Sequence, residues 1–298
     1  MSNKRKIAVV ITARPSYSRI KTALRAIKEH PDLELLLVVT ASALLDRYGS
    51  IVKYIEEDGF DIAEKVFMVL EGEDFTSMAK TTGIGVLELT TVFGNLRPDI
   101  VVTVADRYET MSTAIAASYM NIPLAHIQGG EISGNIDGKV RHAITKLADI
   151  HLVSTEKAKE RVIKMGEIPS SVFNTGCPSI DLVEEVYKSP EINFELFRKY
   201  RRVGNKLDLP DVYVVALQHP VTTEFQVARR QIEETLFALN SLSVSVLWFW
   251  PNSDAGADGT SNGIRAFRES VKPQNMHFFK NLEGCDFLRL LYNSKCIV

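Results

Sequence analysis

The stretch from Asp99 to Ile127 reads DIVVTVADRYETMSTAIAASYMNIPLAHI. Two short apolar runs, DIVVTVA (99–105) and IPLAHI (122–127), flank an amphipathic segment of helical length, RYETMSTAIAASYM. Strands that are separated by a helix pair in parallel, because a tight hairpin joins only antiparallel strands. Strands that are apolar on both faces belong to a sheet that helices cover on both sides. This stretch therefore predicts a βαβ unit.

The same alternation of apolar runs and helical segments continues along the chain. The further candidate strands are IAVVIT (7–12), LELLLVV (33–39), DIHLVS (149–154), DVYVVALQ (211–218), SVLWFW (245–250), NMHFF (275–279) and KCIV (295–298). We expect an α/β protein with two doubly wound, Rossmann-like domains.

The alternation pauses between the two groups of strands. Residues 178–210 are helical in pattern and highly charged, with no strand candidate. We therefore predict an N-terminal α/β domain over 1–180, a helical linker region over 181–210 and a C-terminal α/β domain over 211–298. KCIV is typical of a buried strand and the sequence stops inside it, so we interpret the second domain as incomplete.

Composition and charge limit the class of ligand. The formal net charge of −2 gives no general attraction for nucleic acid or an anionic membrane, so a local cluster of cations must hold any anionic ligand. No run approaches the ~18 apolar residues of a membrane span. The three cysteines lack CxxC spacing, which favours a reducing compartment and a cytoplasmic location. No metal-ligand cluster is visible in the sequence.

In open α/β sheets, ligands gather beyond the carboxyl ends of the strands. ARPSYS follows the first strand, where Arg14 could contact a phosphate with help from Ser18. The alternative is a helix start, with Pro15 in the first turn and Ser16 or Ser18 as the cap. A GxGxxG dinucleotide motif is absent here, and the two interpretations stay open.

DRYET follows the strand DIVVTVA and places Asp106 and Arg107 where a strand becomes a helix. Taken alone, Asp106 is interpreted as a helix N-cap.

The loop after IPLAHI, HIQGGEISGNIDGKVRH (126–142), is rich in glycine, but its spacing matches neither the Walker nor the Rossmann pattern. Asn135 and Asp137 are candidate caps for the next helix, and Asp137 and Arg141 are four residues apart and can pair. Glu131 has no such structural role, and a carboxylate directly beyond a strand can act as an acid or base. The loop is therefore predicted to be catalytic rather than phosphate-binding.

In the second domain, ALQHPVTTE places His219 at another strand end. A lone histidine is more often structural. This one is expected to face the same ligand-binding cleft as the strand-end residues of the first domain. The segment PNSDAGADG (251–259) lacks EF-hand spacing and is interpreted as a long loop on the cleft rim.

Six motifs occur in order along the chain: ARPSYS, DRYET, HIQGGEISGNID, TGCPSIDL, ALQHPVTTE and PNSDAG. Together they resemble the hydrolysing UDP-N-acetylglucosamine 2-epimerases of sialic-acid biosynthesis, both the bacterial enzymes and the epimerase half of the bifunctional animal enzyme. The resemblance implies a glycosyltransferase-B fold with the nucleotide sugar UDP-N-acetylglucosamine in the interdomain cleft. It also implies anti elimination of UDP, rehydration of a 2-acetamidoglucal to N-acetylmannosamine, no cofactor or metal, and a homodimer.

The resemblance assigns roles position by position. The expected catalytic residues are Asp106, Glu131, Asp137 and His219, the last of them near the diphosphate. The expected nucleotide- or substrate-binding residues are Arg14, Ser18, Arg107, Arg141, His142 and Asn252.

Family members continue past KCIV with further nucleotide-binding residues, so we interpret the chain as C-terminally truncated. Three alternatives remain: a sugar-transferring member of the same fold, a catalytically inactive nucleotide-sugar-binding fragment, and an epimerase that takes a GDP-linked substrate in a legionaminic-acid-type pathway.

Overall fold

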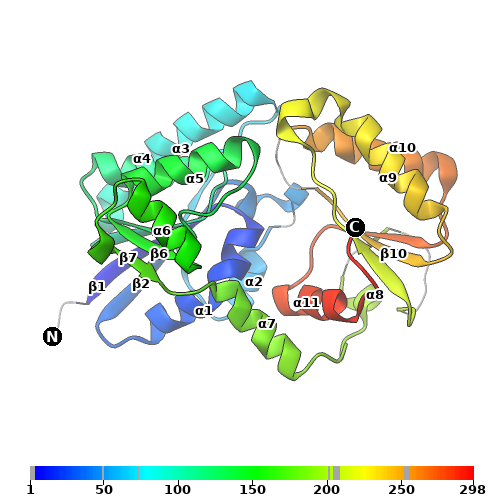
Figure 1. The fold of residues 1–298 in the computed structure, drawn as a ribbon, viewed down its shortest axis with the longest axis horizontal. Coiled ribbons are helices and arrows are strands. Elements are labelled where there is room, and N and C mark those ends of the chain that lie inside the picture. The colour runs from blue at the N-terminus through cyan, green and yellow to red at the C-terminus, as the bar shows by residue number, and fades with distance from the viewer. Residues whose placement is uncertain (1–3, 49, 73, 201, 204–208, 252–254) are drawn as a thin grey trace. The chain divides into compact units, whose positions relative to one another are not determined.

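The computed structural model describes residues 4–48, 50–72, 74–200, 202–203, 209–251 and 255–298. The chain divides into two compact units. The first comprises Met1–Glu71 and Thr76–Asp181, and the second comprises Gly72–Phe75 and Leu182–Val298. Each unit contains one sheet with helices packed against it (Figure 1). Among the described residues, no helix combines the length and the apolar character that crossing a bilayer requires.

The sheet of the first unit is entirely parallel, with strand order β3-β2-β1-β4-β5-β6-β7. Its strands are β1 (Arg5–Ile11), β2 (Leu33–Thr40), β3 (Ile62–Val66), β4 (Ile100–Val104), β5 (Leu124–Ile127), β6 (Ile150–Val153) and β7 (Val172–Asn174). The strand order reverses between β1 and β4. In doubly wound sheets, ligands bind outside the carboxyl ends of the strands at such a reversal.

Helices cover both faces of this sheet. They are α1 (Arg14–Glu29), α2 (Val52–Glu57), α3 (Phe75–Leu96), α4 (Thr110–Tyr119), α5 (Asn135–Leu147) and α6 (Glu156–Lys164), with short 3₁₀ helices η1 (Ala41–Leu44), η2 (Asp46–Tyr48) and η3 (Pro169–Ser171). Figure 1 shows α1 and α2 on one face and α3, α4 and α5 on the other. Within β1, Val9 packs into the core under α1, and Ala8 and Val10 pack into the opposite core. This two-sided burial explains why the strand is apolar throughout.

The second unit has a four-stranded sheet in the order β8-β11-β10-β9. Its strands are β8 (Arg202–Val203), β9 (Tyr213–Ala216), β10 (Ser245–Phe249) and β11 (Met276–Phe279). In the described part of this sheet, β8 pairs antiparallel with β11 and the other pairs are parallel. The helices are α7 (Pro178–Lys188), which begins in the first unit, α8 (Leu196–Lys199), η4 (Thr222–Val227), α9 (Ala228–Asn240), α10 (Ala257–Val271) and α11 (Gly284–Asn293). One core lies under α9 and α10 around the fully buried Trp248. The other lies on the opposite face and includes Leu290 of α11.

The predicted α/β class with doubly wound parallel sheets is confirmed. The strands β3, β7 and β8 were not predicted from the sequence. Within the segment interpreted as a linker, Leu196 and Tyr200 are buried in a core of the second unit. Residues 295–298 pair with β9 in an extended conformation, as predicted, but the prediction that they are buried is wrong. This segment runs beside β9 through a parallel bridge between Val215 and Ile297, but its four residues are exposed.

Candidate active site

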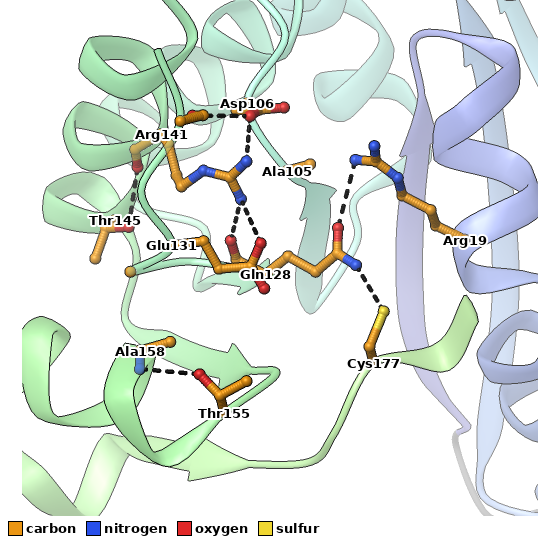
Figure 2. A network of polar contacts seen from close by, with 12 residues as sticks. Arg19, Ala105, Asp106, Gln128, Glu131, Arg141, Thr145, Thr155, Ala158 and Cys177 are labelled. Carbon is orange, nitrogen blue, oxygen red and sulfur yellow. Dashed lines mark hydrogen bonds and ion pairs between the residues drawn. The ribbon is translucent and has the colours of Figure 1, made fainter. Parts of the chain in front are cut away.

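The candidate site lies in the first unit at the carboxyl ends of β4 and β5. These strands are paired in parallel, with Val104 opposite Ile127, so the segments that follow them leave the sheet side by side. Asp106 comes just after β4, and Glu131 lies in the loop after β5. Arg141 reaches both carboxylates from α5, as Figure 2 shows.

The Arg141 guanidinium is the centre of this cluster. Its side chain is only 6% exposed, and its Nη2 forms an ion pair with Asp106 Oδ2. Its Nη1 donates to the carbonyl oxygen of Gln128 at 2.5 Å and lies 3.7 Å from Glu131 Oε2. Asp106 also accepts a hydrogen bond from Ser133 Oγ at 3.2 Å. One cation therefore holds a buried carboxylate and lies within ion-pair distance of a second carboxylate that is 37% exposed.

The backbone turns sharply at the ends of three strands in this sheet. Ala41 after β2, Ala105 after β4 and Gln128 after β5 have φ values of 52°, 61° and 63°. The left-handed conformation is uncommon for residues with a side chain, and such residues cluster at functional sites. The turn at Ala105 directs Asp106 towards Arg141.

Asp106 does not have the helix N-cap role that its position suggested. Helix α4 begins at Thr110, and Glu109 occupies the N-cap position. The Asp106 carboxylate instead forms an ion pair with Arg141 and accepts a hydrogen bond from Ser133.

Gly130 has φ +74° and packs tightly against α6. A Cβ at this position would lie 2.5 Å from Val162 Cγ2 and 2.6 Å from the carbonyl oxygen of Ala158. The carbonyl of Gly130 in turn accepts a hydrogen bond from Arg161 of α6. The close contact with α6 is therefore sufficient to explain the glycine at position 130. Binding of a phosphate by the loop is not required to explain it.

Asp137 and His142 both lie on α5. The helix begins at Asn135 with Gly134 as its N-cap and no side-chain cap, so the predicted capping roles of Asn135 and Asp137 are wrong. Asp137 occupies the first turn, where the helix dipole stabilises a negative charge. His142 is half-buried, and its Nδ1 has no hydrogen-bond partner within the part of the chain that the structure describes.

Helix α1 begins at Arg14, with Ala13 as the N-cap and Pro15 in the first turn. Ser16 and Ser18 lie inside the helix, so the prediction that one of them caps it is wrong. Burial lowers the pKa of the Arg14 guanidinium, and the charge of Tyr54 opposes this shift. Arg14 and Ser18 thus occupy the first turns of the helix that follows β1.

A neighbouring residue of α1, Arg19, contacts the loop after β5. Its Nη1 donates to Gln128 Oε1 at 3.5 Å, and Gln128 Nε2 donates to Cys177 Sγ at 3.0 Å (Figure 2). The Gln128 side chain thereby connects α1 to the segment after β7. Arg19, Gln128 and Cys177 were not predicted from the sequence, because none of them stands out by residue type or spacing.

Arg107 is held by a residue that the sequence analysis also missed. Its Nε and Nη2 donate to the two carboxylate oxygens of Glu109 at 3.2 and 3.1 Å. The Glu109 side chain is fully buried, and the Arg107 side chain is 13% exposed. This bidentate pair fixes the guanidinium at the carboxyl end of β4.

The two remaining predicted residues lie after strands of the second unit. His219 follows β9 and is half-buried, and Asn252 lies outside the described residues. Of the predicted catalytic residues, the first unit thus brings Asp106 and Glu131 together on Arg141. Across the described ranges, no group of three or more His, Cys, Asp or Glu residues could hold a metal ion.

A doubly wound α/β unit followed by a second, smaller α/β unit is the fold of the glycosyltransferase-B-like proteins. The family model described as UDP-N-acetylglucosamine 2-epimerase matches residues 25–298. The chain belongs to this family.

Similar proteins occur among named bacterial 2-epimerases and polysialic acid biosynthesis proteins. The UDP-N,N'-diacetylbacillosamine 2-epimerase (hydrolyzing) of Legionella pneumophila is 32% identical over 97% of this chain and 74% of its own length. The polysialic acid biosynthesis protein P7 of Escherichia coli is 31% identical over 96% of this chain and 71% of its own length.

Solved structures share the fold. The UDP-GlcNAc 2-epimerase of Neisseria meningitidis, bound to UDP-GlcNAc, superposes with a TM-score of 0.75 and 18% identity, covering 98% of this chain and 76% of that one. A putative UDP-N-acetylglucosamine 2-epimerase from Listeria monocytogenes gives a TM-score of 0.74 at 18% identity, covering 99% of this chain and 73% of that one.

Proposed function

We propose that this chain is a hydrolysing 2-epimerase that converts UDP-N-acetylglucosamine and water to N-acetylmannosamine and UDP. The observation that carries the proposal is the pair of carboxylates, Asp106 and Glu131, that Arg141 holds at the ends of two adjacent parallel strands. Membership of the family supports it, and so does the resemblance of the strand-end motifs.

The reaction has two steps. In the first, a carboxylate takes the C2 proton while the C1–O bond breaks, its electrons leave with UDP, and a C1–C2 double bond forms. In the second, the oxygen of water adds to C1, and a proton is delivered to C2 on the opposite face. The C2 proton is weakly acidic, so the base must be positioned against it as the leaving group departs.

Asp106 and Glu131 are the proposed proton-transfer residues, and Asp137 assists them. Glu131 has the more exposed carboxylate, which gives it direct access to a bound sugar. Asp106 is mostly buried and receives hydrogen bonds from Arg141 and Ser133, which restrict its position. Rehydration needs both an acid and a base, and these carboxylates can divide the two roles.

The nucleotide is expected to bind through cations and hydroxyl groups. His219 is proposed to lie near the diphosphate, where its ring would stabilise the charge that develops on UDP. The further proposed binding residues are Arg14, Ser18, Arg107, Arg141, His142 and Asn252.

A proton NMR time course with UDP-N-acetylglucosamine in D2O tests the proposal. We expect free UDP together with N-acetylmannosamine that carries deuterium at C2. Glu131→Gln should retain nucleotide-sugar binding but lose turnover, whereas Glu34→Gln, an exposed carboxylate on β2, should keep both. Turnover that survives in Glu131→Gln would remove Glu131 from the mechanism. A folded chain that binds the sugar without releasing UDP would favour the inactive binding protein.

A second candidate differs in the substrate. Relatives at 32% and 29% identity are named UDP-N,N'-diacetylbacillosamine and GDP/UDP-N,N'-diacetylbacillosamine 2-epimerases. Comparing kcat/KM for these nucleotide sugars with that for UDP-N-acetylglucosamine decides between them. A higher kcat/KM for a diacetylbacillosamine substrate would move the enzyme to a legionaminic-acid-type pathway. Release of UDP only when a sugar acceptor is present would instead indicate a transferase.

The resemblance also leads us to propose a cytoplasmic homodimer whose partner molecules are its small-molecule substrates. Light scattering of the purified chain tests the dimer, since a monomer would scatter with half the expected mass.

A further inference from the structure

His126 is the third residue of β5, and its ring is completely buried. Its Nε2 lies 2.8 Å from the carbonyl oxygen of Ala105, and its Nδ1 lies 3.2 Å from Thr145 Oγ1. Thr145 Oγ1 donates in turn to the carbonyl oxygen of Arg141 at 2.9 Å. The imidazole therefore connects the end of β4 to α5.

Each end of this connection lies next to a residue of the candidate site in the chain or on the helix. Ala105 is the left-handed residue that directly precedes Asp106. Thr145 lies one helical turn after Arg141, whose guanidinium pairs with Asp106. The ring thus fixes the backbone behind both members of the ion pair, although it touches neither of their charged groups.

The protonation of the ring follows from its partners. A carbonyl oxygen only accepts, so Nε2 carries the proton and donates to Ala105, which leaves Nδ1 as an acceptor facing the Thr145 hydroxyl. That hydroxyl has a single proton, which Nδ1 and the carbonyl oxygen of Arg141 share. Burial, followed by the nearby charges of Arg141, His151 and His142, lowers the pKa of His126 to about 3, although the bond to Ala105 opposes this shift. The neutral ring is therefore the state that bridges the two elements at neutral pH.

Little space surrounds the bridge. A Cβ at Gly129 would lie 3.0 Å from His126 Nδ1 and 3.1 Å from Thr145 Oγ1. Such close contact means that the loop after β5 packs directly on the ring and the hydroxyl. A side chain of different shape at position 126 would therefore displace the loop, α5 or the end of β4.

We propose that His126 is a positioning residue of the epimerase reaction, which holds the Ala105–Asp106 peptide and the Arg141 turn of α5 in the reactive arrangement. This inference rests on the function proposed above. It predicts a larger effect on the chemical step than on nucleotide binding, because Asp106 transfers protons, whereas Arg141 is one of several proposed binding residues.

The test compares two variants. His126→Leu removes both hydrogen bonds, whereas in His126→Gln the side-chain amide can still donate to Ala105. We expect His126→Leu to lower kcat about 100-fold with KM changed by less than about threefold, since a displacement of about 1 Å has effects of this size. His126→Gln should recover at least about tenfold of that loss.

His151 provides the matched control. It is a fully buried histidine that pairs with His126 in register on β6, and its Nε2 lies 3.3 Å from Glu167. His151→Leu should destabilise the same sheet yet leave kcat of the folded protein unchanged. Equal losses of kcat in the two leucine variants would overturn the proposal, and so would an unchanged kcat in His126→Leu.

A readout without turnover separates this inference from the proposed function. In NMR spectra of labelled protein, His126→Leu should shift the backbone amide signals of Asp106 and Arg141, and His126→Gln should restore them. His151→Leu should leave both signals in place. Unchanged Asp106 and Arg141 signals in His126→Leu would refute positioning even if the wild-type chain releases UDP. If wild type releases no UDP, the proposed function fails while the amide shifts still decide whether His126 positions these residues.

Discussion

The ion pair between Arg141 and Asp106 is buried, and this burial determines how much stability is lost when either partner is removed. The two side chains are 6% and 12% exposed. Arg141→Gln leaves the Asp106 charge uncompensated, and breaking a buried pair in this way costs about 3–5 kcal/mol of unfolding free energy. Adding Asp106→Asn should recover a large part of that loss, because the stranded charge is then absent.

Urea unfolding of the single and double variants measures this coupling. Lys53→Gln is the control, because Lys53 and Glu57 form an ion pair with side chains that are 81% and 57% exposed. That substitution should cost less than about 1 kcal/mol. Additive losses in the double variant would mean that Arg141 and Asp106 are not energetically coupled.

Tyr213 gives the second unit a defined response to alkaline pH. Its hydroxyl donates to the carbonyl oxygen of Leu290 at 2.8 Å, and burial raises its pKa to about 12. The unfolded chain releases this proton near pH 10, so the contribution to stability is complete below pH 10 and is lost as the pH rises to about 12. The difference amounts to about 2–3 kcal/mol.

Comparison with Tyr213→Phe isolates this effect. Phenylalanine has no proton to release, so the variant should lose less stability than wild type between pH 10 and 12. Tyr292, which is 56% exposed, supplies the control variant Tyr292→Phe. Parallel stability curves for wild type and Tyr213→Phe over this range would show that the phenol does not titrate with unfolding.

At the residue scale, the sequence could indicate Asp106 and Glu131, because charged residues soon after strands are visible in any α/β pattern. Arg141 was indicated by the family resemblance. The sequence could not indicate Gln128 or Glu109. Their roles depend on how the backbone turns after β4 and β5, and the turns use alanine and glutamine rather than the glycine or asparagine that usually marks a left-handed residue. The same turn made the N-cap interpretation of Asp106 wrong.

At the scale of elements, the packing of the β5–α5 loop on α6 depends on Gly130. Gly130→Ala would place a Cβ within 2.6 Å of Ala158 O and would also strain a residue at φ +74°. Because the carbonyl of Ala158 belongs to the helix backbone, the loop must move, and Glu131 moves with it. We expect a loss of at least about 1–2 kcal/mol and a large fall in UDP release.

Gly134→Ala is the matched control for this loop. Gly134 has φ −78°, and a Cβ there would meet no atom within 4 Å. Thermal unfolding and UDP-release assays on the two variants should therefore differ clearly. Equal effects of the two substitutions would mean that the loop tolerates displacement from α6.

The strands that the sequence analysis missed in the first unit, β3 and β7, are the outer strands of the sheet. Edge strands carry polar and charged residues that obscure the apolar run. In β3, IAEKV, the central Ala63, Glu64 and Lys65 are all exposed, and in β7 only Val172 is buried. The inner strands were predictable because helices cover both of their faces, which requires continuous apolar sequence.

At the scale of the whole molecule, each unit has its own cores on both faces of its own sheet. Leu→Ala substitutions in such cores typically cost 2–5 kcal/mol. We expect Leu89→Ala to weaken the first unit and Leu236→Ala to weaken the second, since both leucines are fully buried. Hydrogen exchange followed by mass spectrometry should show faster exchange in peptides of the altered unit.

The reciprocal peptides supply the internal control. Peptides from the unaltered unit should keep their exchange rates in each variant. Faster exchange throughout the chain after a single substitution would mean that the two units unfold as one cooperative body.

The left-handed residues at Ala41, Ala105 and Gln128 have an evolutionary consequence. Each costs about 1–2 kcal/mol that glycine would not incur, although glycine gives back about 0.5–1 kcal/mol through its freedom in the unfolded chain. A library selected only for resistance to heat should therefore accumulate glycine at positions 41 and 105. A lineage selected for turnover should keep alanine at position 105, because a rigid turn presents the following carboxylate in one direction. The residues found at these positions in related proteins would then indicate whether selection acted mainly on heat resistance or on turnover.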